Sequence, residues 1–158
     1  MKNLVLAVLL TCSTCVCFGQ KSLISYEDLK YILHNNLQRA DTFLMAKGYT
    51  LTLKNTKTNN RIYTLSIKGG SHVNVSLRAD GKRLFMELET NAMEQYDLLN
   101  NSISQYIHTK GAIGDIQTYV IKNLCEIYIT TNDTMPYDPL KKDYVVQIIS
   151  DKNITAYD

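Results

Sequence analysis

The sequence lacks a charge imbalance and most signatures of a catalytic site. Its 158 residues carry a formal net charge of +2, and its lysines and arginines form no run. A nearly neutral chain has no basic surface for nucleic acid or an anionic membrane, so we expect no nucleic-acid partner. Outside the first nineteen residues it has no Gly-x-Ser-x-Gly motif, no glycine-rich phosphate loop and no Cys-x-x-Cys motif. These absences favour a protein without a cofactor or metal and without catalytic residues.

Cysteine is also scarce once the start of the chain is set aside. Three of the four cysteines fall at positions 12, 15 and 17, and Cys125 is the fourth. A single remaining cysteine excludes an internal disulfide, so the fold depends on its hydrophobic core. Cys125 lies in an apolar, strand-like run, where a buried thiol is the expected state.

The first nineteen residues predict a secretory signal peptide. Lys2 gives a positive start, an apolar run covers residues 4–10, and small residues precede a cleavage site near Gly19. This run is too short for a transmembrane helix, which takes ~20 residues, so we expect no integral membrane span. We therefore predict that residues 1–19 are removed and that residues 20–158 form a single secreted or periplasmic domain. A lipid anchor at Cys12 or Cys15 is the alternative, although neither follows the glycine, alanine or serine preferred for such processing.

A long amphipathic segment predicts the first helix. Apolar residues recur at steps of three or four from Tyr26 onward, as on the buried face of a helix. Ser25 is a favourable N-cap, and Gly48 is able to adopt the left-handed conformation that ends a helix. We expect one helix from about Tyr26 to Lys47, with Leu33 in the core.

A second helix follows from residue 91. Asn91 and Glu94 have the spacing of a capping box, and a similar apolar stripe follows. Gly111 and Gly114 bracket the expected end of this helix, which places His108 in its last turn.

Seven further segments predict strands. Apolar and polar residues alternate in the first four, which is typical of strands with one buried face. The segments are 49–54, 63–68, 73–78, 84–89, 116–121, 126–131 and 144–150. The fold class is therefore α+β, with two helices packed on antiparallel sheet or sheets in the order α-β-β-β-β-α-β-β-β.

The two halves of this order suggest an internal duplication, with half-repeats at 25–90 and 91–158. A shift of 66 residues places Leu33 on Leu99 and Gly48 on Gly114. Any two amphipathic helices match at some offset, so chance is the alternative. The element order resembles that of the secreted β-lactamase-inhibitor family, which repeats a helical segment and a four-stranded sheet. That resemblance involves no motif, and the disulfides of that family are missing here.

The expected function is that of an exported, non-catalytic binding protein. The longest predicted loop, residues 132–140, contains both prolines, and within it Met135, Tyr137 and Leu140 are the candidate residues for contact with another protein. One alternative is an enzyme of the cell envelope with a dispersed site, which would need the separated histidines, at positions 34, 72 and 108, or Cys125 to converge. Another is a structural envelope protein that pairs through strand edges.

Overall fold

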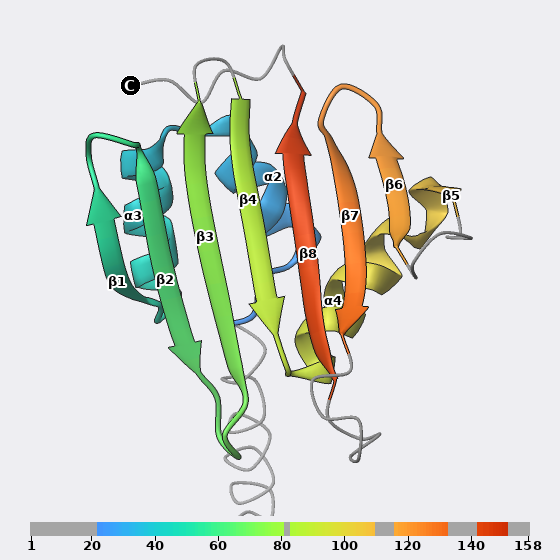
Figure 1. The fold of residues 1–158 in the computed structure, drawn as a ribbon, viewed down its shortest axis with the longest axis horizontal. Coiled ribbons are helices and arrows are strands. Elements are labelled where there is room, and N and C mark those ends of the chain that lie inside the picture. The colour runs from blue at the N-terminus through green and yellow to red at the C-terminus, as the bar shows by residue number, and fades with distance from the viewer. Residues whose placement is uncertain (1–21, 81–82, 110–115, 133–141, 152–158) are drawn as a thin grey trace, which may run out of the picture.

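The computed structural model describes residues 22–80, 83–109, 116–132 and 142–151. In this part of the chain, three α-helices lie on one face of an antiparallel sheet, which confirms the predicted α+β class (Figure 1). None of the helices described there is long and apolar enough to cross a bilayer. The predicted signal peptide and its cleavage site lie outside the described residues.

The segment predicted as one helix forms two, α2 (Tyr26–His34) and α3 (Leu37–Ala46). Asn35 adopts an extended conformation at the end of α2, and the side chain of Asn36 accepts a hydrogen bond from Arg39 N at 2.9 Å as the N-cap of α3. Asparagine competes for backbone hydrogen bonds within a helix and is favoured at caps, so this pair divides the predicted helix.

Both outer ends of this helical pair agree with the prediction. Ser25 is the N-cap of α2, and it forms a reciprocal capping box with Asp28. Gly48 follows α3 with φ +96°. Gly48 N donates to Met45 O at 3.0 Å and Tyr49 N to Leu44 O at 3.0 Å, the two bonds of a Schellman motif.

The second predicted helix is shorter than expected and begins differently. Helix α4 spans Met93–Ile103, a short 3₁₀ turn covers Ser104–Tyr106, and residues 107–109 form a strand, so His108 is not in a helix. The predicted capping box is wrong. Ala92 is the N-cap with no side-chain cap bond, because Asn91 Oδ1 accepts a hydrogen bond from His72 N at 2.8 Å instead.

The strands agree with the seven predicted segments and add one short strand. The sheet has the order β1-β2-β3-β4-β8-β7-β6-β5 among the described residues. The bounds are β1 (Thr50–Asn55), β2 (Asn60–Ser66), β3 (His72–Asp80), β4 (Arg83–Thr90), β5 (Ile107–Thr109), β6 (Gln117–Ile121), β7 (Cys125–Asn132) and β8 (Asp143–Ser150).

Each half of the chain contributes four consecutive strands to this sheet. The halves meet where β4 pairs with β8, so the two sets form one continuous sheet (Figure 1). Helices α2 and α3 precede the first set, and α4 precedes the second. The element order thus repeats, while a common origin of the two halves stays a prediction.

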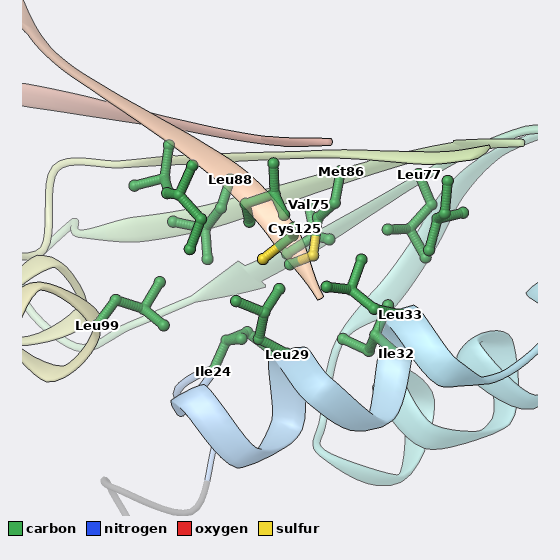
Figure 2. Packing of buried hydrophobic residues seen from close by; sticks show 14 of the residues in the cluster. Ile24, Leu29, Ile32, Leu33, Val75, Leu77, Met86, Leu88, Leu99 and Cys125 are labelled. Atoms are coloured by element: carbon green, nitrogen blue, oxygen red, sulfur yellow. The ribbon is translucent and has the colours of Figure 1, made fainter. Parts of the chain in front are cut away.

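The core lies between the helices and the sheet. Leu29, Ile32 and Leu33 of α2 point toward the sheet, where Val75 and Met86 face them (Figure 2). Each of these five side chains is at most 2% exposed. The free thiol of Cys125 lies in the same cluster, as predicted, and burial raises its pKa to about 12.

Strand β1 departs from the expected alternation. Tyr49, just before the strand, is buried, but Leu51 is only half-buried and Leu53 is 43% exposed. The register with β2 shifts between Leu51 and Leu53, which marks a β-bulge. The bulge changes which face the following residues occupy, so strict alternation fails there.

Candidate functional site

Among the described residues, no helix covers the sheet face opposite α2, α3 and α4, and we call it the open face. Figure 1 looks onto it, with the helices behind the sheet. Because side chains alternate along a strand, the buried residues of each strand identify the outward ones between them. On the four central strands these are Asn74, Ser76 and Arg78 of β3, Phe85, Glu87 and Glu89 of β4, Val145, Gln147 and Ile149 of β8, and Glu126, Tyr128 and Thr130 of β7.

A hollow of about 330 Å³ lies on this open face. The residues that line it come from β2, β3, β4 and β8. They include Asn60, Arg78, Phe85, Glu87, Gln147 and Ile149. A second hollow of about 330 Å³ adjoins Val120, Glu126 and Ile149. Since Ile149 lines both, the two hollows are neighbours on the same surface.

The register aligns these side chains in rows across the strands. One row reads Arg78, Phe85, Ile149, Glu126, from β3 through β4 and β8 to β7. Its two central members are apolar, and its outer members carry opposite charges. The adjacent row consists of Ser76, Glu87, Gln147 and Tyr128.

Contacts within the open face hold its polar groups in place. The Arg78 guanidinium lies 5.0 Å from the centre of the Phe85 ring, within the range of a cation–π interaction. Gln147 Nε2 donates to Glu87 Oε2 at 3.0 Å, and Tyr128 OH donates to Glu126 Oε2 at 2.7 Å. The hydrogen bond to Glu126 raises the pKa of Tyr128, so its hydroxyl stays protonated and able to donate.

A second polar cluster, formed by Asp41, Lys54, Arg61 and Tyr63, lies on the helix side of the sheet. Asp41 of α3 accepts a short hydrogen bond from the Tyr63 hydroxyl, and it pairs with Lys54 at 3.3 Å and Arg61 at 3.5 Å. Asp41 and Arg61 are only 5% and 7% exposed, and Tyr63 is fully buried. This cluster joins α3 to β1 and β2 and lines neither hollow.

The candidates for a dispersed catalytic site lie on different parts of the fold. His34 ends α2, where its Nδ1 is 2.8 Å from Lys30 O; His72 begins β3, and Cys125 begins β7 beneath the helices. In the described residues, no hydrogen bond joins the side chains of these three to one another or to a carboxylate, and no group of three metal-ligating residues is present. The side chain of His108 lies outside the described set.

The sequence-predicted contact residues Met135, Tyr137 and Leu140 also lie outside the described residues, so their role stays a prediction. Sequence reasoning did not identify the open face as a site, although a signal was present. Phe85, Val145 and Ile149 are apolar residues at positions expected to face water. These residues make the open face less uniformly polar than alternation in the strands predicts.

Comparison with known proteins does not assign this fold to a family. No family model matches the chain, and no curated protein or solved structure matches it significantly. The likeness to the β-lactamase-inhibitor family therefore stays a resemblance of element order.

Proposed function

We propose that this chain is an exported, non-catalytic binding protein and that the open face of its sheet is the binding surface. The observation that carries the proposal is the row of Arg78, Phe85, Ile149 and Glu126 beside the hollow. Aromatic residues and arginine are enriched where proteins contact one another, and an apolar centre with a polar rim is typical of such surfaces. A protein partner fits this composition better than a small apolar ligand, which an enclosed pocket would favour.

Binding through the open face is favoured over pairing along the edge of the sheet. The described sheet has two edge strands: β1 carries a β-bulge and Lys54, and β5 is only three residues long. These features disfavour the addition of another strand. The structural role through edge pairing therefore has less support than the face of the sheet.

A photo-crosslinking experiment tests the binding surface. Benzoyl-phenylalanine replaces Phe85 on the open face in one variant and Tyr31 in another. Tyr31 belongs to α2 and is 42% exposed, so it serves as a matched aromatic control on the helix side. Both variants are expressed with the natural leader in the host and irradiated. We expect a crosslinked protein adduct from position 85 and none from position 31, whereas equal adducts, or none from position 85, would contradict the proposal.

Export is tested separately by N-terminal sequencing. We expect the protein from the periplasm or medium to begin at Gln20, because Gly19 precedes the predicted cleavage site. Chain that retains Met1 in the cytosol would contradict export. A mature chain that starts at a lipid-modified Cys12 or Cys15 would replace free export with a membrane anchor.

A further inference from the structure

We infer that the open face binds a second copy of this chain, in a symmetric face-to-face dimer. This inference rests on the proposed function, because it names the occupant of the same surface. It depends on the order of the side chains across the sheet, which the strand register gives directly.

The first row is self-complementary when the sheet is turned over. Its order is cation, apolar, apolar, anion: Arg78, Phe85, Ile149, Glu126. The middle of this row lies between β4 and β8. A twofold axis through that point, parallel to the strands, reverses the row in the second copy. Arg78 of each copy then faces Glu126 of the other, and Phe85 faces Ile149, so one operation creates two ion pairs and two apolar contacts.

The adjacent row is complementary under the same axis. It runs Ser76, Glu87, Gln147, Tyr128, again with its middle between β4 and β8. The Glu87 carboxylate of each copy faces the Gln147 amide, which is a hydrogen-bond donor. Tyr128 of each copy faces Ser76, beside the hollow that Ser76 and Asn60 line. In the dimer, the hollow beside β3 of one copy thus receives Tyr128 from β7 of the other copy.

The size and the packing angle of the sheet are compatible with such a dimer. Six strands, β2 to β6 in sheet order, spaced ~4.8 Å apart and with about eight residues at ~3.3 Å each, give a face of roughly 750 Å². A standard interface buries about 800 Å² on each partner. Sheets that pack face to face cross at about 30°. Because Arg78 and Glu126 lie only one and a half strand spacings from the axis, this crossing displaces each of them from its facing residue by roughly 4 Å, which an arginine side chain can span.

The charges in the first row favour a second copy as the surface that lies opposite that row. Arg78 and Glu126 are both exposed, and neither forms an ion pair with another described residue. Their opposite signs cancel within this row, whereas Glu87 and Glu89 add negative charge elsewhere on the face. The row itself is complementary to a surface with the reverse order of charges, which an identical copy turned over supplies.

Sedimentation equilibrium of the exported, purified chain tests the inference. We expect the wild type to be a dimer at micromolar concentration. Arg78→Glu and Glu126→Arg each place like charges opposite each other twice, so each alone weakens the dimer by about 100-fold or more. The decisive sample is an equimolar mixture of the two variants. In the mixed dimer every facing pair is again opposite in charge, so we expect the mixture to dimerise where each variant alone is a monomer.

Matched charge reversals on the helix side are the controls. Arg39→Glu in α3 and Glu94→Arg in α4 change exposed residues with the same chemistry, and we expect both to remain dimers. Circular dichroism establishes that all four variants are folded. A monomeric wild type, or a mixture that stays monomeric, would overturn the inference. If crosslinking from position 85 then captures a different protein, the proposed function is still supported. If position 85 gives no crosslink, both the inferred dimer and the proposed function fail.

Discussion

The side chain of Gln95 gives the sharpest test of how the fold is held together. Gln95 lies in the first turn of α4 and is fully buried. Its Oε1 accepts from Ile24 N at 2.7 Å and its Nε2 donates to Ile24 O at 2.9 Å. One amide therefore satisfies both backbone groups of a fully buried residue 71 positions away in the sequence.

We expect Gln95→Leu to destabilise the protein by about 2–6 kcal/mol, because it leaves two buried backbone groups without partners at ~1–3 kcal/mol each. Leucine keeps nearly the same volume, so a cavity contributes little to this loss. Urea denaturation, followed by circular dichroism, gives the free energy of unfolding and its slope with urea.

Gln38→Leu in α3 is the matched control, because Gln38 is exposed and the chemical change is the same. We expect that control to remain within about 0.5 kcal/mol of the wild type. A Gln95→Leu protein as stable as the control would refute the reasoning. Hydrogen exchange adds a local readout: if only the segment at residues 23–25 detaches, the amide of Ile24 loses protection while the strands keep theirs.

Three further predictions concern Asp41, Cys125 and Gly48. Asp41→Ala leaves Arg61 without its buried carboxylate, so we expect a loss of about 3–5 kcal/mol in urea denaturation, whereas Asp97→Ala at an exposed position of α4 changes little. Cys125 has its pKa raised to about 12 by burial, so its contribution to stability is complete below its unfolded pKa of ~8.5 and falls as the pH rises toward 12. Cys125→Ala should therefore make the alkaline decline shallower by up to about 1.4 kcal/mol per pH unit, and an unchanged slope would contradict the assignment. Gly48→Ala should cost about 1–2 kcal/mol in thermal or urea unfolding, because φ is +96° there, and an unaltered stability would show that the turn rearranges.

The sequence alone determined most of the strands and the outer ends of the first helical segment. Alternation in β3 and β4 predicted strands with one buried face, and the buried residues Val75 and Leu88 confirm it. Ser25 and Gly48 predicted where the helical pair begins and ends. These features are local, because period and capping depend on residues within a few positions of one another.

Local patterns gave no correct prediction where a side chain bonds to the backbone of a residue far away in the sequence. Asn91 looked like a helix cap, but its side chain bonds to His72 across the fold. Gln95 carries no local signal of burial, since glutamine is a polar residue, yet its side chain holds Ile24 in the core. In both cases the partner is far away in the sequence, so no pattern within the helix identifies it.

The tertiary structure also decided the candidate site. Only the pairing of β4 with β8 brings Phe85 beside Ile149 and makes one surface from two halves of the chain. The same pairing places Arg78 and Glu126 at equal distances from the centre of the row. Strand order depends on contacts between segments some 60 residues apart, such as Gln147 and Glu87, which the periodicity of a single strand does not encode.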